Sequence, residues 1–382
     1  MKYIEDMELD NKKVILRLDL NVTIKNNEIV DDTKIKKSIP TIKYLLNKNC
    51  HILMMSHLGK VKTEEDKQTN SLRMVCDRLS TLLGEDVLFI PNTESDELIN
   101  SLDNNKLVLM ENTRFEDVPD KRESGCDMEL AKYWAQAGEV FINDAFGTSH
   151  RKHASNYGLS KCLPSAYGFL IKEELVGLDP VVNNIEHPFT VIMGGAKVDD
   201  KVQLIESLLK ECDHLVVGGG IANTFLKASN INIGASLYSE AFVDNVAGLI
   251  NKYKDKVLMP VDVVVEENGV VKEIPLDEIT DASVIYDIGS KTVESYADVL
   301  KNSKTVFVNG TMGMYENEAY RAGTEELYKV LDKVDATIVA GGGDAVSSVN
   351  KLGFQSTFDF LSTGGGATLD YIASKALNCF ED

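Results

Sequence analysis

The segment TVIMGGAKVDDKVQLIESLL, residues 190–209, joins an apolar run to two glycines, two lysines four positions apart and a stretch with helical apolar spacing. This order predicts a buried strand, a tight turn and an amphipathic helix. Glycine lets a ligand approach the backbone, and the free N–H groups of a helix start attract phosphate. The pattern is not a P-loop, which needs Gly, four residues and then Gly-Lys-Ser/Thr. We therefore expect a phosphate-binding junction of another kind.

The same strand-to-helix pattern recurs along the whole chain. Apolar runs occupy 13–22, 51–59, 106–115 and 140–148 in the first half, and 190–197, 214–220, 305–313, 337–344 and 360–366 in the second. Helical spacing lies between them, at 34–48, 71–83, 201–211 and 240–253. Near-continuous apolar strands that alternate with helices indicate a parallel sheet covered by helices. Because the pattern occurs twice, we predict an α/β fold of two doubly wound, Rossmann-like domains.

The boundary between the predicted domains lies in GFLIKEELVGLDPVVNN, residues 168–184. We expect this segment to be helical to about Leu178 and to end at Pro180. It is interpreted either as a hinge helix between the domains or as an ordinary packing helix. The predicted division is a first domain at 1–168, a linking helix at 169–184, a second domain at 185–360 and a C-terminal tail at 361–382.

Composition narrows the classes of partner. With 382 residues, 43% apolar and 26% charged, the chain is long enough for two globular cores. A net charge of -20 argues against a nucleic-acid or anionic-membrane partner. Six scattered cysteines without a C-x-x-C pair predict free thiols in a reducing cytoplasm. No apolar run approaches the roughly 20 residues of a membrane span. We expect a cytoplasmic protein, and nothing in the sequence demands more than a monomer.

Directional polar groups follow the predicted strands of the first half. In open parallel sheets, ligands bind at the carboxyl ends of the strands. The groups at these ends are Arg17, Asp19 and Asn21; His57 and Lys60; Glu111, Asn112 and Arg114; and Asn143, Asp144, His150 and Arg151. The cationic members suit a small molecule that carries phosphate and carboxylate groups.

Glycines follow the predicted strands of the second half. They occur at 194–195, 218–220, 310 and 313, 341–343 and 364–366. Lys197 and Lys201 add positive charge, and Asp344 is placed to hold the magnesium that accompanies a nucleotide. Together the halves predict a kinase that closes to exclude water and transfers a phosphoryl group. A dinucleotide dehydrogenase is disfavoured, because no G-x-G-x-x-G follows a strand.

Nine sequence blocks, in order, resemble the phosphoglycerate kinase family from one end of the chain to the other. They are RLDLNV, SHLGKV, ENTRFED, NDAFGTSHRKHAS, GGAKVDDK, GGGIANTFL, VNGTMGMYE, GGGD and STGGGATLDYI. The H-R-x-H-A-S and G-A-K-V-x-D-K strings are the most specific. The resemblance implies a first domain that binds 3-phosphoglycerate, a second that binds Mg-ATP, and a tail that packs back on the first.

The resemblance also implies roles for individual residues. The substrate-binding set is Arg17, Asp19, Asn21, His57, Lys60, Arg114 and Arg151. The nucleotide-binding set is Gly195, Lys201, Gly219, Gly220, Asn309, Gly310, Glu316, Gly341 and Asp344. The catalytic set is Lys34, Lys197, Gly342 and Gly343. Asp344 is implied as the Mg²⁺ ligand and Glu316 as the ribose contact.

Several positions depart from the family pattern. Lys34 stands where the family has an arginine that bridges the substrate carboxylate, and lysine lacks the planar two-pronged donor. Lys60 also replaces an arginine. The other departures are Thr23 and Thr311 in place of prolines and Val308 in place of an aromatic residue. Ala345 replaces a hydroxyl residue that is expected to donate a hydrogen bond to phosphate. Two interpretations therefore stay open: a working phosphoglycerate kinase, or a weakened paralogue that binds nucleotide or phosphoglycerate.

Overall fold

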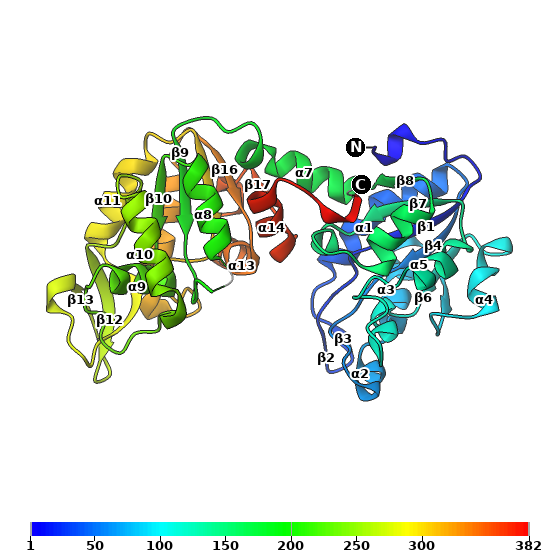
Figure 1. Cartoon of the computed structure of the whole chain (residues 1–382), viewed down its shortest axis with the longest axis horizontal. Coiled ribbons are helices and arrows are strands. Elements are labelled where there is room, and N and C mark those ends of the chain that lie inside the picture. Colours follow the sequence, from blue (N-terminus) through cyan, green and yellow to red (C-terminus); the bar gives the residue numbers. More distant parts are fainter. Residues whose placement is uncertain (1, 200, 381–382) are drawn as a thin grey trace. The chain divides into compact units, whose positions relative to one another are not determined.

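The computed structural model describes residues 2–199 and 201–380. The chain forms two compact units. One holds Met1–Leu175 and the segment from Ala376 onward, and the other holds Val176–Lys375. Each unit contains a six-stranded parallel sheet with helices packed against it (Figure 1). The predicted α/β fold with doubly wound parallel sheets is confirmed.

The sheet of the first unit has the strand order β5-β6-β4-β1-β7-β8, and every neighbouring pair is parallel. Its strands are β1 (Lys13–Leu18), β4 (His51–Met55), β5 (Leu88–Ile90), β6 (Leu107–Met110), β7 (Val140–Asp144) and β8 (Ser165–Tyr167), and β2 (Ile24–Lys25) with β3 (Glu28–Ile29) forms a hairpin. Its helices are α1 (Thr33–Asn47), α2 (Glu64–Thr69), α3 (Arg73–Leu83), α4 (Asp96–Ile99), α5 (Met128–Ala135) and α6 (Leu159–Cys162). Short helical segments are η1 (Ile4–Asp6), η2 (Ser101–Asp103), η3 (Thr113–Asp117), η4 (Phe146–Thr148), η5 (Ala154–Gly158) and η10 (Asn378–Phe380).

Two apolar cores cover the two faces of this sheet. Leu16 of β1 packs in one core with Ile42 of α1 and Leu79 of α3. The next residue toward the N-terminus, Ile15, packs in the other core with Trp134 of α5. This alternation follows from the two-residue side-chain period of a strand. Because both faces are apolar, the polar groups of the strands are confined to the strand ends.

The parallel sheet of the second unit has the order β11-β10-β9-β15-β16-β17. Its strands are β9 (Phe189–Met193), β10 (His214–Val217), β11 (Val257–Leu258), β15 (Thr305–Asn309), β16 (Thr337–Ala340) and β17 (Phe360–Leu361). The helices are α8 (Val202–Glu211), α9 (Gly219–Ala228), α10 (Val243–Lys252), α11 (Ser290–Leu300), α12 (Ala322–Leu331), α13 (Gly343–Leu352) and α14 (Gly366–Ser374). Short segments are η6 (Glu240–Phe242), η7 (Leu276–Glu278), η8 (Glu318–Tyr320) and η9 (Gln355–Thr357).

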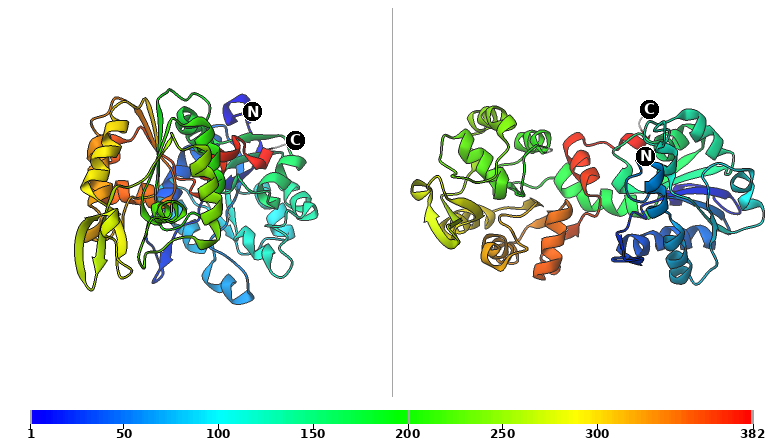
Figure 2. Two further views of the ribbon diagram at one scale, coloured as in Figure 1. Left: turned by 60° about the vertical axis from the view of Figure 1, so that its left-hand side comes forward. Right: turned by 90° about the horizontal axis from the view of Figure 1, so that it is seen from below.

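A small antiparallel sheet, β13-β12-β14, extends the second unit (Figure 2). Its strands are β12 (Asp262–Glu267), β13 (Val270–Pro275) and β14 (Val284–Ile288). The sequence prediction did not include it. Most of β13 is exposed, so this strand lacks the continuous apolar run by which the other strands were recognised.

The linking helix α7 (Phe169–Val182) continues past Pro180, so the predicted end near Leu178 is wrong. A proline inside a helix lacks the N–H donor and crowds the carbonyl four residues before it, here that of Val176, which is left without that partner. Val176 is 64% exposed, and water can therefore solvate the freed carbonyl. Helical hydrogen bonding resumes at once, since the Asn183 N–H donates to the Asp179 carbonyl at 3.0 Å.

The segment from Ala376 onward belongs to the first unit, whereas α14 belongs to the second, so the predicted tail of 361–382 begins too early. The N–H of Cys379 donates to the Ser149 carbonyl at 3.2 Å, and Phe380 stacks on Tyr167 with ring centroids 4.3 Å apart. Cys379 itself is fully buried. All six cysteines have free thiols, which agrees with the sequence prediction.

None of the helices in the described ranges combines the length and apolar character that a membrane span needs.

Asp144, the last residue of β7, caps the start of α7. Its Oδ1 accepts the N–H of Leu170 at 2.8 Å and that of Ile171 at 3.3 Å. Complete burial outweighs these donors and raises the pKa of Asp144 to about 7. A carboxyl whose pKa is higher in the folded than in the unfolded state stabilises the protein fully at pH values below its unfolded pKa. That stabilisation is lost as the pH rises to about 7.

We predict that Asp144→Asn removes this pH dependence, because asparagine keeps the carbonyl acceptor but cannot ionise. Relative to the variant, the wild-type free energy of unfolding should fall by up to about 4 kcal/mol between pH 4 and pH 8. Urea unfolding followed by fluorescence of Trp134, the single tryptophan and buried in the same unit, measures it. The exposed Asp120→Asn is the control. Parallel pH profiles for wild type and Asp144→Asn would contradict the raised pKa.

Candidate active site

Charged and polar side chains gather where β1, β4 and β6 of the first unit end. Asp19, His57 and Arg114 follow these three adjacent strands. His57 is 9% exposed. Burial lowers the pKa of His57 well below its usual value, and the nearby cations Arg17, Arg114 and Lys34 lower it further. The strand order therefore brings together groups that are far apart in the sequence, and the imidazole among them is neutral near pH 7.

Arg17 lies in the protein interior rather than at an open surface. Its side chain is fully buried, its Nε donates to Ser155 Oγ at 2.8 Å, and its Nη1 donates to the Leu18 carbonyl at 2.8 Å. Nη2 lies 4.0 Å from Glu123 Oε1 and 3.4 Å from His57 Nδ1. The predicted substrate-binding arginine is thus placed behind His57, where it supports the site.

Lys34, in the first turn of α1, forms an ion pair with Asp19. Its Nζ lies 2.9 Å from Oδ2 and 3.2 Å from Oδ1. Asn21 ties the loop after β1 to the loop after β4, because its Oδ1 accepts the N–H of Gly59 at 2.8 Å. Next to Gly59, Lys60 is exposed. Three of the predicted substrate residues, Asp19, Asn21 and Lys60, thus lie at one end of the sheet with the predicted catalytic Lys34.

Arg114 has donor capacity that the protein does not use. Its Nη1 lies 3.4 Å from Asp117 Oδ2, but its Nε is buried and has no hydrogen-bond partner among the described residues. An unsatisfied buried donor on a cation is costly, and an anionic ligand would satisfy it. The exposed Arg151 lies within electrostatic range of His153, close to the same cluster.

Other polar groups at these strand ends serve the fold. Glu111 accepts the Leu72 N–H at 2.8 Å, and Asn112 donates to the Leu58 carbonyl at 2.7 Å. The Nδ2 of Asn143 donates to Ser149 at 3.1 Å, and Asp144 caps α7. We assign these residues to the structure rather than to ligand binding.

His153, Glu123 and Ser155 were not predicted, although they belong to the cluster. Ser155 links Arg17 to Glu123, whose Oε2 accepts the Ser155 N–H at 3.0 Å. Burial, with Arg17 and Arg114 nearby, lowers the pKa of His153 to about 3, so this imidazole is also neutral. The second histidine of the H-R-x-H motif was the available signal for His153. Glu123 has no such signal, because it stands in an unremarkable polar loop.

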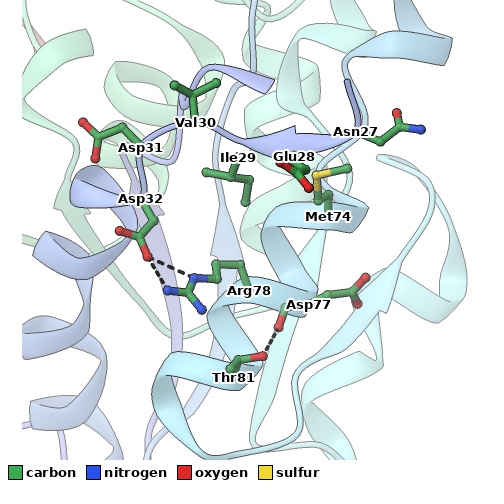
Figure 3. A pocket seen from close by; sticks show the side chains of 10 residues that line it. All are labelled: Asn27, Glu28, Ile29, Val30, Asp31, Asp32, Met74, Asp77, Arg78 and Thr81. Atoms are coloured by element: carbon green, nitrogen blue, oxygen red, sulfur yellow. Dashed lines mark hydrogen bonds and ion pairs between the residues drawn. The ribbon is translucent and has the colours of Figure 1, made fainter. Parts of the chain in front are cut away.

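A concavity of about 540 Å³ lies elsewhere in the first unit, between segment 27–32 and α3 (Figure 3). None of the predicted site residues lines it. Its Asp32 accepts from Arg78 Nε at 3.0 Å and from Lys36 Nζ at 2.7 Å. These ion pairs hold the start of α1 in place, two residues before Lys34. We therefore assign the residues that line the concavity a structural role at the start of that helix.

In the second unit, backbone segments meet at the strand ends with glycines between them. A Cβ on Gly220 would stand 1.9 Å from the Ala196 carbonyl oxygen, and one on Gly310 would stand 2.3 Å from that of Gly194. Gly219 also needs its left-handed φ of 59°. Glycine is therefore required at these positions for the close packing of protein backbone against protein backbone, whereas the predicted approach of a ligand to these glycines stays a prediction.

Asn309 and Gly342 form a second turn at this edge. The Asn309 Nδ2 donates to the Gly341 carbonyl at 2.7 Å, and Gly342 adopts a φ of 95° directly before α13. A Cβ on Gly342 would lie 2.4 Å from that same nitrogen. Because its amide nitrogen is engaged, Asn309 holds the glycine turn in place. Gly343 follows as the exposed first residue of α13.

A cavity of about 320 Å³ opens beside these glycines. It is lined by Gly195, Ala196, Gly219, Gly220, Asn223, Leu237, Val284, Ile285, Tyr286, Thr311, Gly313, Met314, Tyr315, Glu316 and Asp344. Five residues predicted to bind nucleotide are among them. Gly310, Asn309, Gly341 and Lys201 lie outside the lining and shape the turns or charges around it.

The two predicted lysines differ in their surroundings. Lys201 precedes α8, and its Nζ donates to the Gly194 carbonyl at 2.9 Å. Lys197 is exposed in the loop after β9. Lys201 is thus held against the glycine edge, whereas the side chain of Lys197 reaches solvent.

Asp344 has the chemistry that a nucleotide-bound magnesium ion needs. It is exposed in the first turn of α13 and borders the cavity. Mg²⁺ is usually bound through one or two carboxylates together with waters and substrate phosphates. A single accessible carboxylate beside glycine-rich helix starts fits that requirement.

The structure shows the surroundings of three residues that depart from the family pattern. Thr311 borders the cavity and closes its loop by donating to the Gly313 carbonyl at 2.9 Å. Val308 and Ala345 lie fully buried in the apolar core of the second unit. The side chain of Ala345 therefore packs in the interior rather than facing solvent beside Asp344.

Known proteins resemble the chain over nearly its whole length. A sequence profile described as Phosphoglycerate kinase matches residues 4–375. The chain is 43% identical over 385 residues to a phosphoglycerate kinase of Enterococcus faecalis, covering 98% of this chain and 97% of that protein. It is 44% identical over 384 residues to that of Macrococcus caseolyticus, with the same coverage. The solved structure of phosphoglycerate kinase from Coxiella burnetii superposes with a TM-score of 0.88, at 33% identity and covering 99% and 97% of the two chains.

A second solved structure, phosphoglycerate kinase from Pyrococcus horikoshii, has a TM-score of 0.83 at 28% identity and the same coverage. Fold and sequence thus agree on one class of protein, a kinase built from doubly wound α/β units. More narrowly, the chain belongs to the phosphoglycerate kinase family. The resemblance inferred from the nine sequence blocks is confirmed.

We predict that Gly220→Ala lowers the free energy of unfolding by about 1–3 kcal/mol, because the added methyl overlaps a backbone oxygen. Gly248→Ala is the matched control. Gly248 lies in α10, and a Cβ there meets no atom within 4 Å. Alanine should raise the stability there by up to about 1 kcal/mol. Urea unfolding followed by circular dichroism checks both variants, and equal effects would contradict the close backbone approach.

Proposed function

We propose that this protein catalyses reversible phosphoryl transfer between ATP and the carboxylate of 3-phosphoglycerate, giving ADP and 1,3-bisphosphoglycerate. The observation that carries the proposal is the cationic cluster at the strand ends of the first unit. It holds Lys34 and Arg114 beside a neutral His57, in a chain whose net charge is -20. Membership of the phosphoglycerate kinase family supports the same reaction.

In the first unit, we assign substrate binding to Asp19, Asn21, His57, Lys60, Arg114 and Arg151. The positive charge of Arg114 and its unsatisfied, buried Nε support an anionic partner there. A neutral His57 can donate one hydrogen bond and accept another without adding charge. Arg17 takes a supporting role through Ser155 and Glu123.

In the second unit, we assign nucleotide binding to the glycine-lined cavity. Gly195, Gly219 and Gly220 allow phosphates to approach the backbone, and the start of α9 offers a positive dipole. Glu316 borders the same cavity, where the ribose hydroxyls are its expected partners. Lys201 and the turn of Asn309, Gly310 and Gly341 complete this set.

Asp344 is the residue that would hold Mg²⁺. When bound with the nucleotide, the ion would neutralise phosphate charge. The chain's own groups then have little covalent chemistry to perform, because a carboxylate is already ionised at neutral pH and attacks without a general base. Their task is to position the reactants and to neutralise charge on the transferring group. We assign this task to Lys34 and Lys197, with the Gly342 and Gly343 backbone at the start of α13.

The test is a coupled assay for ADP formation from ATP and 3-phosphoglycerate. Turnover that requires both substrates supports the enzyme. Absence of turnover together with intact ATP binding by calorimetry would favour the alternative, a weakened paralogue that acts as a binding protein. The cytoplasmic location and monomeric state remain predictions from the sequence.

We predict that Lys34→Arg raises kcat. The guanidinium presents two parallel donors, so it can bind Asp19 and still face an oxyanion, whereas the ammonium of Lys34 is engaged by both Asp19 oxygens. The gain should be at least several-fold, and its upper limit is the roughly 10³–10⁵ that a catalytic arginine contributes.

The matched control is Lys36→Arg, since Lys36 lies on the same helix but pairs with Asp32 instead. Steady-state kinetics at saturating substrates give kcat for both variants. An unchanged or lower kcat for Lys34→Arg would mean that the site is arranged around lysine.

A further inference from the structure

A chain of hydrogen bonds in the first unit begins at the buried Glu123 and ends at His57. The two carboxylate oxygens of Glu123 accept the hydroxyl and the backbone N–H of Ser155 at 2.5 Å and 3.0 Å. The Oγ of Ser155 accepts from Arg17 Nε at 2.8 Å, and Arg17 Nη2 lies 3.4 Å from His57 Nδ1. The chain therefore connects a carboxylate that is fully buried to a residue of the candidate site.

The direction of each hydrogen bond follows from the groups themselves. A carboxylate has only acceptors, and a guanidinium has only donors. Ser155 must therefore donate its hydroxyl proton to Glu123 and accept the Arg17 Nε–H on a lone pair. Burial holds the pKa of His57 well below its usual value, so the ring is neutral and carries one proton. Because Nδ1 faces a donor that cannot accept, that proton belongs on Nε2.

Arg17 presents Nη2 to His57 because its other nitrogens are held. Nη1 donates to the Leu18 carbonyl at 2.8 Å, and Nε donates to Ser155. The guanidinium is planar, so these two contacts fix the direction of Nη2. The contact with Ser155 depends in turn on Glu123. Without the carboxylate, the hydroxyl proton would be free to turn toward Arg17 and oppose its Nε–H.

The other ring nitrogen of His57 is the one that a ligand can contact. Among the described residues, Nε2 has no hydrogen-bond partner, and it is not one of the fully buried polar atoms that lack one. It therefore keeps some access to solvent. With the proton on Nε2, this atom donates to an anion. In the opposite tautomer, it would set a lone pair against the anion.

We propose that Glu123 is a positioning residue, which acts through Ser155 and Arg17 to hold His57 in the tautomer with its proton on Nε2. This inference rests on the proposed function, in which His57 binds 3-phosphoglycerate. A route through His153 is excluded, because its Nδ1 lies 3.7 Å from Glu123 Oε1, which is too far for a hydrogen bond.

The tautomer is measured by ¹⁵N–¹H correlation NMR of the imidazole rings in the wild-type protein at neutral pH. The chain has six histidines, and the His57→Ala variant identifies the His57 signals by their loss. We expect a protonated Nε2 and an unprotonated Nδ1. A protonated Nδ1 would overturn the proposal, and this measurement needs neither turnover nor a variant of Glu123. In Glu123→Gln, signals of both tautomers should appear.

Steady-state kinetics measure the consequence for the site. Glutamine keeps the size of Glu123 but has one acceptor instead of two and no charge. In Glu123→Gln, the KM for 3-phosphoglycerate should rise about tenfold, as expected for a weakened hydrogen bond to a charged group, while the KM for ATP should not change. A merely structural role would lower the fraction of folded enzyme, and hence the apparent kcat, and would leave both KM values unchanged. That result would overturn the proposal.

Glu139→Gln is the matched control. Glu139 also accepts a backbone N–H, that of Lys13 at 3.0 Å, and it pairs with Lys12 Nζ at 2.8 Å. These contacts lie where β1 begins, at the opposite end of the strand from the site. This variant should keep both wild-type KM values.

A double-mutant cycle shows whether Glu123 acts through His57. In the His57→Ala background, Glu123→Gln should leave the KM for 3-phosphoglycerate unchanged. The same rise in that background would mean that Glu123 acts by another route. If Glu123→Gln does not fold, Ser155→Ala replaces it, since alanine removes the hydroxyl and keeps both buried charges. Absence of turnover, with 3-phosphoglycerate binding by calorimetry and the Nε2–H tautomer both intact, would leave this inference standing while the proposed reaction fails.

Discussion

The strand ends of the second unit depend on backbone segments that touch without side chains between them. A Cβ on Gly194 would stand 2.1 Å from the Thr311 carbonyl oxygen, and one on Gly219 would stand 2.7 Å from that of Gly195. Such contacts let three loops converge where the helices begin. They place the glycine turns along one side of the cavity, whereas apolar and polar side chains line the rest of it. The glycine side of the nucleotide site that we propose is therefore a property of chain geometry.

In the first unit, by contrast, the site consists of side chains that must be held in place. The buried Arg17 donates hydrogen bonds to Ser155 Oγ and to the Leu18 carbonyl, and it lies near Glu123. Breaking such a buried pair from one side is strongly destabilising, because an uncompensated charge remains. The same network stands behind His57 and keeps its environment dry and cationic. Rigidity thus comes from interior polar contacts, and recognition comes from groups nearer the surface.

Much of this could be predicted from the sequence, because the signals are local. Apolar runs marked the central strands, and glycines after them marked the turns of the second unit. The exposed β13 carries no continuous apolar run, so the antiparallel sheet was missed. Burial of Arg17 could not be predicted either, since it depends on Glu123, which is over one hundred positions away. Asn223 lies inside a predicted motif, but only the structure shows that its Nδ2 donates a hydrogen bond to the Leu237 carbonyl.

The thiol of Cys379, near the end of the chain, can report on how that segment is packed. Cys379 is fully buried against Ser149 and Tyr167, and burial raises the pKa of its thiol. Alkylating reagents attack the thiolate, and only where they can reach it. The modification rate at Cys379 therefore measures how often the final segment detaches from the first unit, on a timescale set by the reagent concentration. Mass spectrometry can separate this signal from the half-buried Cys126 and Cys162.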